Sequence, residues 1–243
     1  ITEQYATFNI SGPKTKEIMS KVFPKIDFSN ESFPFMTFQF HEHQETQIRI
    51  LRASFTGELG YEIYVPANKS LQVWEQIHNY GKEFNLIPYG TETMHLLRAE
   101  KGYIIVGQDT DGSITPIDLG LTWMIGKNKK DFLGKRSLTR SDTIRTDRKQ
   151  LVGIIPLDRK DSLEEGQHII LNQNITTPMP MLGHITSSYH SPTLRHSFGL
   201  AVIKDGHSLI GKKAYASTSD QKTIAVEIVK PIFYDENNKK LVS

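Results

Sequence analysis

The chain has 243 residues and a mass of 27.7 kDa, with 37% hydrophobic and 23% charged residues, the composition of an ordinary globular protein. Its 29 Lys and Arg nearly balance 27 Asp and Glu, and no apolar run reaches the ~18 residues of a membrane-spanning helix, so we expect neither nucleic acid nor a membrane as partner. The absence of cysteine excludes disulfides, thiolate metal sites and a cysteine nucleophile, and we expect a cytoplasmic protein.

The first half of the sequence mixes helical and strand-like patterns. Ser11-Gly12-Pro13 predicts the N-terminus of a helix, because a hydroxyl cap and an early proline precede apolar residues at helical spacing. The further predicted elements are strands at residues 34–40, 47–54 and 61–65 and helices at residues 68–84 and 91–101. We expect the last two strands to form a hairpin, and this order of elements is typical of an antiparallel sheet covered by helices, an α+β fold.

A polar stretch at residues 131–149 separates this half from a region of different texture. Beyond it, short strand-like runs alternate with Gly, Pro, Asp and Asn turns, at residues 151–155, 168–171, 184–188, 200–203 and 223–229. Short strands at this spacing predict a small barrel or sandwich. We therefore expect one domain over residues 1–148 and a second over residues 149–243.

Few motifs in the sequence indicate chemistry. No G-x-G-x-x-G, P-loop or G-x-S-x-G pattern is present. His41 and His43 could form a metal pair, but two surface imidazoles are the simpler interpretation, and we expect no metal site. Arg98 and Glu100 fit a structural ion pair or charges at a helix end, and the acidic run at residues 107–112 fits a structural loop, because it lacks the twelfth-position ligand of a calcium loop.

Glu62 stands out because it lies inside a run of strong strand formers, Tyr61 to Val65. By alternation it shares a face with Tyr64 and opposes Tyr61, Ile63 and Val65. In one interpretation it is an exposed residue on the solvent face of an antiparallel strand. In the other its carboxylate points into a cavity and accepts two N–H donors of a ligand.

Seven segments carry a likeness to a known family. They are residues 55–66 (FTGELGYEIYVP), 88–95 (PYGTETMH), 98–102 (RAEKG), 107–116 (GQDTDGSITP), 131–138 (DFLGKRSL), 183–189 (GHITSSY) and 233–235 (FYD). They resemble the folate-binding aminomethyltransferase superfamily, which includes the T-protein of the glycine cleavage system. Within it, the chain is most similar to the C-terminal half of the α subunits of heterotetrameric sarcosine oxidases.

The resemblance implies an N-terminally truncated, ferredoxin-like α+β domain followed by a C-terminal β-barrel domain, with tetrahydrofolate as the bound cofactor. Glu62 matches the family glutamate that holds the pterin ring, and Tyr234 matches a C-terminal tyrosine that contacts folate. Thr56 and Tyr64 are expected to line the same pocket. Met94 stands where the glycine-cleavage branch has an arginine that reaches the folate, which favours a substrate other than an aminomethyl-lipoyl protein.

The family's catalytic aspartate would precede residue 1, so the resemblance assigns no catalytic residue here. Since the chain also does not begin with Met, we expect it to be a piece of a longer protein. The implied function is to trap the one-carbon unit of sarcosine as 5,10-methylenetetrahydrofolate, within a complex whose other subunits and segments bring FAD, FMN and NAD, and the chain alone is not expected to perform the oxidation. The alternatives are an aminomethyltransferase, a demethylase of another one-carbon donor, or a non-catalytic scaffold module.

Overall fold

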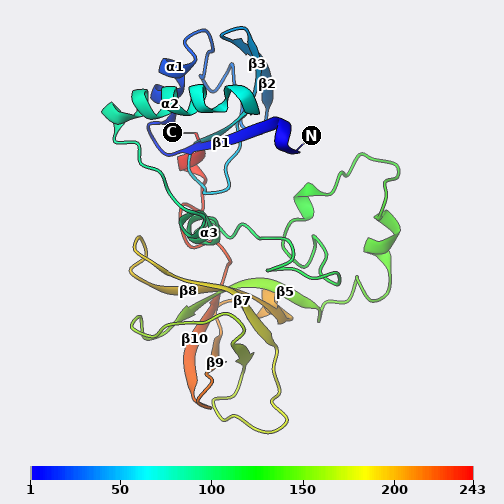
Figure 1. The fold of residues 1–243 in the computed structure, drawn as a ribbon. Helices are drawn as coiled ribbons and strands as arrows, with labels where there is room; N and C mark the ends of the chain where they lie inside the picture. Colours follow the sequence, from blue (N-terminus) through cyan, green and yellow to red (C-terminus); the bar gives the residue numbers. More distant parts are fainter. Residues whose placement is uncertain (1, 243) are drawn as a thin grey trace. The chain divides into compact units, whose positions relative to one another are not determined.

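A computed structural model describes residues 2–242. The structure divides into two compact units, with the divisions between residues 97 and 98 and between residues 234 and 235 (Figure 1). The first unit therefore contains the N-terminal part of the chain and its last residues, and the second unit contains everything between. The predicted domain boundary at residues 148 and 149 lies within the second unit, immediately before its first strand.

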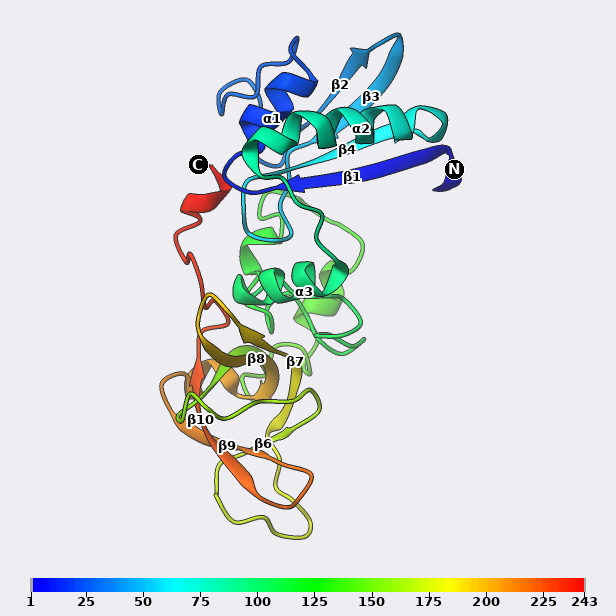
Figure 2. The same cartoon turned by 60° about the vertical axis from the view of Figure 1, so that its left-hand side comes forward.

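The first unit is built on a four-stranded antiparallel sheet with the strand order β1-β4-β3-β2. The strands are β1 (Tyr5–Ser11), β2 (Phe38–His43), β3 (Thr46–Leu51) and β4 (Gly60–Pro66). The predicted hairpin of β3 and β4 is present, and the chain adds a second, tighter hairpin between β2 and β3. The strand β1 lies at the edge of the sheet, beside β4 (Figure 2).

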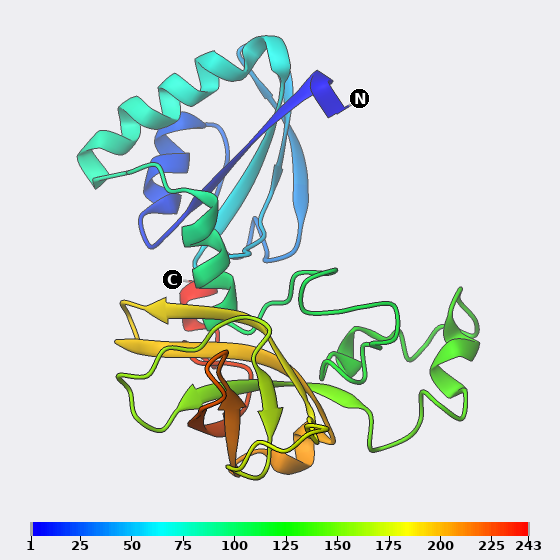
Figure 3. The ribbon, with the colours of Figure 1, turned by 60° about the horizontal axis from the view of Figure 1, so that its bottom comes forward.

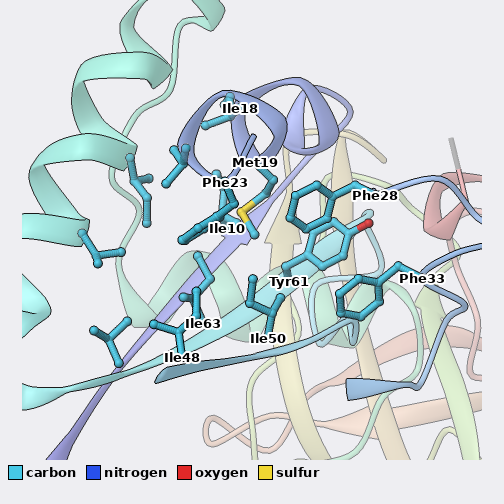
Figure 4. Close-up of a cluster of buried hydrophobic side chains, with 14 of the residues drawn as sticks. Ile10, Ile18, Met19, Phe23, Phe28, Phe33, Ile48, Ile50, Tyr61 and Ile63 are labelled. Carbon is cyan, nitrogen blue, oxygen red and sulfur yellow. The ribbon is translucent and has the colours of Figure 1, made fainter. Parts of the chain in front are cut away.

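Two helices, α1 (Thr15–Val22) and α2 (Ser70–Gly81), cover one face of this sheet. The core between helices and sheet contains Met19 and Phe23 from α1 and its end, Val73 and Ile77 from α2, and Ile63 from β4. Figure 4 shows these layers meeting around the aromatic rings of the core. Burial of this apolar surface stabilises the unit, at roughly 25 cal/mol per Å².

The structure corrects the prediction for the first residues. Ser11 is the last residue of β1 and caps no helix, because α1 begins at Thr15 and its N-cap residue, Lys14, makes no side-chain capping bond. The turn at Gly12, where φ is 128°, separates the strand from the helix. A glycine tolerates this conformation without steric cost, so the Ser-Gly-Pro signal marks a strand end followed by a turn.

The second unit contains a closed barrel, whose strands curve around one another in Figure 3. It has six strands in the order β10-β5-β8-β7-β6-β9. Its strands are β5 (Lys149–Pro156), β6 (His168–Ile170), β7 (Gly183–Ser191), β8 (His196–Lys204), β9 (Lys213–Ser217) and β10 (Thr223–Val229). The predicted barrel is confirmed, and of its strands only β9 was not predicted. Closure of the sheet leaves no strand edge open to pairing.

The remaining regular elements are the helix α3 (Thr91–Glu100), within which one unit gives way to the other, and short 3-10 turns. These turns are η1 (Thr2–Gln4), η2 (Ala67–Lys69), η3 (Lys82–Phe84), η4 (Thr122–Met124), η5 (Lys135–Thr139), η6 (Gly206–Leu209) and η7 (Lys239–Leu241). In the part of the chain that the structure describes, no helix combines the length and the apolarity needed to cross a bilayer.

A buried ion pair ties the end of α3 to the barrel inside the second unit. Arg98 Nη1 lies 2.5 Å from Asp109 Oδ2, and both side chains are fully buried. The other carboxylate oxygen of Asp109 accepts bonds from the hydroxyls of Thr186 and Ser187, each at 2.6 Å. The ion-pair partner of Arg98 is therefore Asp109 of the acidic loop, whereas Glu100 accepts a bond from Ser191 Oγ at 2.5 Å.

Removal of one member of this pair should destabilise the second unit strongly, because the other charge would stay buried without compensation. We expect Asp109→Ala to lower the free energy of unfolding of that unit by about 3–5 kcal/mol. Arg145→Ala, which breaks two exposed ion pairs, with Asp142 and with Asp147, is the matched control and should leave the urea midpoint nearly unchanged. Equal midpoints for the two variants, measured by urea denaturation with circular dichroism, would contradict this.

Candidate functional site

Glu62 lies on the face of the sheet that α1 and α2 leave uncovered. In β4 the side chains of Tyr61, Ile63 and Val65 are fully buried in the core, whereas Glu62 and Tyr64 point to the opposite face and are partly exposed. The alternation predicted from the sequence is therefore present. Glu62 is therefore neither fully exposed nor fully buried.

The strand register places defined neighbours beside Glu62 on this open face. Asn9 of β1 and Leu51 of β3 are its direct cross-strand partners. The direct cross-strand partners of Tyr64 are Thr7 of β1 and Arg49 of β3. Side chains that oppose each other across antiparallel strands lie about 4.5–5.5 Å apart at Cβ. The open face thus carries two adjacent rows of side chains, with Glu62 in one and Tyr64 in the other.

Tyr64 holds one carboxylate oxygen of Glu62. Its hydroxyl donates a hydrogen bond to Glu62 Oε2. This bond, together with burial and the negative charge of Glu62, raises the pKa of Tyr64 to about 12. Arg49 lies on the other side of Tyr64, where it lowers that pKa, and its guanidinium stacks on the ring of Phe40 at 4.9 Å. Tyr64 therefore remains a neutral donor at physiological pH and orients the carboxylate.

Glu62 has no cationic partner. Among residues 2–242 it forms no salt bridge, and its hydrogen bond from Tyr64 occupies only one of the lone-pair positions of the carboxylate. A partly buried carboxylate in this state can accept two parallel N–H donors of a ligand, as an Arg–carboxylate pair does. The chemistry available at Glu62 is thus recognition of a flat, donor-bearing group.

Thr56 lies in the turn that leads into β4 and is buried. Its hydroxyl oxygen accepts a hydrogen bond from the amide of Glu58 at 3.4 Å, while the amide of Gly57 donates to Ser54 Oγ at 3.0 Å. These contacts shape the turn that starts β4. The predicted role of Thr56 in lining a ligand pocket stays a prediction.

Tyr234 lies in the second unit, where its amide donates to the carbonyl oxygen of Glu100 at 3.0 Å. The adjacent Phe233 amide donates to the same carbonyl at 2.9 Å. These bonds fix the backbone of Tyr234 within that unit. Its predicted contact with the ligand held by Glu62 remains a prediction, as the two residues belong to different units.

A cavity of about 310 Å³ lies in the first unit, at the edge of the sheet beside β1. Its walls are mostly apolar and include Phe8, Asn9, Trp74, Leu86, Tyr89 and Met94. Neither Glu62 nor Tyr64 lines it. Met94, at the position where the resemblance implied an arginine in another branch, forms part of this apolar wall and offers no charge to an anionic ligand.

The two histidines of β2, His41 and His43, form hydrogen bonds with glutamine side chains of the same unit. The ring nitrogen Nε2 of His41 lies 2.9 Å from Gln39 Oε1, and that of His43 lies 2.9 Å from Gln76 Oε1. Burial lowers the pKa of His41. They lie in a strand, on its helix-covered side, and are partly buried, whereas the sequence suggested surface imidazoles. Residues 2–242 contain no group of three His, Cys, Asp or Glu side chains placed to bind a metal ion.

Replacement of Glu62 should be visible in the titration of Tyr64. Glu62→Gln removes the negative charge that favours the neutral phenol, so the pKa of Tyr64 should fall from about 12 toward the usual value near 10. Ultraviolet difference titration of the variant against the parent measures this shift, and Tyr64→Phe identifies which phenol titrates. An unchanged titration curve would contradict the contact between the two side chains.

Two family models match the chain. Residues 1–129 match the GCVT N-terminal domain, and residues 149–235 match the glycine cleavage T-protein C-terminal barrel domain. The solved structure of glycine cleavage system aminomethyltransferase T from Bartonella henselae has the same fold, with a TM-score of 0.76 over 96% of this chain and 60% of that one. Its sequence identity is 22%.

The chain is similar to two kinds of curated proteins, sarcosine oxidase α subunits and aminomethyltransferases. The sarcosine oxidase α subunits of Corynebacterium sp. strains P-1 and U-96 are 49% and 44% identical over 87% and 99% of this chain. The chain spans only 22% and 25% of their lengths. The aminomethyltransferase of Halothermothrix orenii is 32% identical over 84% of this chain and 54% of its own. Since the match to the GCVT N-terminal domain covers more than half of the sequence, the chain belongs to the glycine cleavage T-protein family.

Proposed function

We propose that this chain is the tetrahydrofolate-binding part of a sarcosine oxidase α subunit. The higher identity to two sarcosine oxidase α subunits than to aminomethyltransferases supports this choice within the family. The observation that carries the proposal is the partly buried Glu62 carboxylate, which has no cationic partner in the described chain and is oriented by Tyr64.

The chemistry of the pterin ring fits this carboxylate. The 2-amino group and N3–H of a pterin form two parallel donors in one plane, and a carboxylate accepts both in a charge-assisted bidentate contact. A ligand without this donor pair would leave the carboxylate unsatisfied at a cost of about 1–3 kcal/mol. The hydrogen bond from Tyr64 to one oxygen lowers the conformational freedom that Glu62 loses when the ligand binds.

The contribution of this chain to the reaction is positioning. Tetrahydrofolate supplies the nitrogens N5 and N10, which trap the one-carbon unit of sarcosine to form 5,10-methylenetetrahydrofolate. Glu62 fixes the pterin end of the molecule and thereby reduces the orientations that the reacting nitrogens can sample. Oxidation of sarcosine requires flavin, so we assign FAD, FMN and NAD, and contacts to the other subunits, to the complete complex.

Two further assignments belong to the same proposal. We place the boundary between the folate-binding domain and the barrel domain at residues 148 and 149, where the polar segment ends and β5 begins. We also propose that Tyr234 and Thr56 contact the folate together with Glu62 and Tyr64. A cytoplasmic location, based on the cysteine-free sequence, remains a prediction.

Folate binding should depend on the charge of Glu62. Replacing the carboxylate by an amide removes one charge-assisted acceptor, so we expect Glu62→Gln to weaken tetrahydrofolate binding about 10- to 100-fold. Isothermal titration calorimetry under anaerobic conditions measures the change. Glu42→Gln is the matched control, since Glu42 is an exposed residue of β2 in the same sheet. The affinity of this variant for tetrahydrofolate should equal that of the parent.

The same titration separates the proposal from its alternatives. A parent chain that binds no folate would favour a scaffold module over a folate-dependent enzyme. Equal affinity of Glu62→Gln and the parent would remove Glu62 from the site. If tetrahydrofolate binds as expected, turnover of the complete complex with sarcosine and with other methylated amines distinguishes sarcosine from another one-carbon donor.

A further inference from the structure

Asn9 of β1 stands beside Glu62 although nothing in its local sequence indicates a site. The amide of Gly12 donates to the carbonyl of Leu59 at 2.8 Å, in continuation of the β1–β4 register. Hydrogen-bonded and non-hydrogen-bonded pairs alternate along antiparallel strands. Counting back from Gly12, the pair of Asn9 and Glu62 is non-hydrogen-bonded, the kind in which opposing side chains come closest.

The carboxamide of Asn9 is held by two hydroxyl groups. Its oxygen Oδ1 accepts hydrogen bonds from Ser11 Oγ at 2.7 Å and from Tyr89 Oη at 2.8 Å. With the oxygen occupied twice, the amide nitrogen Nδ2 is left as a donor, and it has no partner among residues 2–242. A hydroxyl can also accept from an amide nitrogen, so the neighbouring carboxylate decides this orientation: an N–H group beside the negative charge of Glu62 is favoured over a second oxygen.

The two side chains together present a defined pattern of hydrogen-bonding groups. Glu62 offers two acceptors and Asn9 offers one donor, on adjacent strands of one rigid sheet. The complementary ligand edge carries two donors followed by one acceptor. A 2-amino-4-oxopyrimidine ring has this edge: its 2-amino group and N3–H are the donors, and its 4-oxo oxygen is the acceptor.

We propose that Asn9 is a further ligand-binding residue, whose Nδ2 donates to the 4-oxo oxygen of the pterin ring that Glu62 holds. This inference rests on the proposed folate-binding function and adds the determinant that selects a 4-oxo over a 4-amino ring. A 2,4-diaminopteridine places an amino group against Asn9, so two donors face each other, and it also lacks the N3 hydrogen that Glu62 accepts.

The test compares tetrahydrofolate with tetrahydroaminopterin, which carries an amino group in place of the 4-oxo group. Both are titrated anaerobically by calorimetry into the full chain, the parent and its variants, and the readout is the ratio of the two dissociation constants. We expect Asn9→Ala to weaken tetrahydrofolate binding about 3- to 10-fold. Tetrahydroaminopterin binding should stay the same or become tighter, because the variant lacks the donor that faces the 4-amino group. The preference for the 4-oxo ring should therefore fall by at least the factor that tetrahydrofolate loses.

Asn9→Asp gives a second, sign-sensitive measurement. It keeps the shape of the side chain but turns the donor into an acceptor, so the preference should fall further than in Asn9→Ala. Repulsion between the new carboxylate and Glu62 affects both ligands and largely cancels in the ratio. Thr7→Ala is the matched control, because Thr7 lies on the same face of β1 in the next row, and its ratio should equal that of the parent. Thermal midpoints of all variants check that the fold is retained.

The outcomes separate the two proposals. A lower preference in Asn9→Ala and a still lower one in Asn9→Asp, with Thr7→Ala unchanged, supports the role of Asn9. Tetrahydrofolate binding with the parental ratio in both Asn9 variants overturns the role of Asn9 and leaves the proposed function standing. A parent chain that binds neither ligand overturns both.

Discussion

The two-residue repeat of β4 is the constraint on which the candidate site depends. Successive side chains of a strand point to opposite faces. Because Tyr61, Ile63 and Val65 are buried under the helices, Glu62 and Tyr64 must lie on the other face of β4. A shift of the register by one residue would place the carboxylate in the apolar core, at a cost of several kcal/mol. The packing of the core therefore fixes the face of β4 on which the carboxylate lies.

The residues that carry the family resemblance divide into two physical roles. Those of the turn and strand around Glu62 shape an open sheet face and leave a carboxylate without a cationic partner in the described chain. Those around Arg98 form a buried network in the second unit, where the guanidinium pairs with Asp109 and the hydroxyls of β7 bond to both groups. Arg98 Nε is buried without a hydrogen-bond partner among the described residues. The bonds that this charge pair does form are directed at the protein, which indicates a structural role.

The sequence-based predictions were wrong or incomplete at two strands, β1 and β9, where the local sequence pattern differs from the structure that tertiary packing imposes. The strand β1 alternates Ala6, Phe8 and Ile10 toward the helices, but the Ser-Gly-Pro turn after it resembles a helix start. The strand β9 has a weak strand signal, since its inward side chains are Ala214 and Ala216, and alanine has low β propensity. These small residues suit the interior of a six-stranded barrel, where larger side chains from neighbouring strands fill the space.

The sequence by itself determined the α+β character of the first half, the barrel of the second, and the face of β4 on which Glu62 and Tyr64 lie, because hydrophobic periodicity is a local property of the chain. Only the tertiary structure decided which side chains stand next to that carboxylate. Strand order and register bring Asn9 and Leu51 to Glu62 from opposite sides. In the other unit, packing of the end of α3 and the acidic loop against β7 brings Asp109 to Arg98. Such pairings depend on how distant segments pack, and no local pattern contains them.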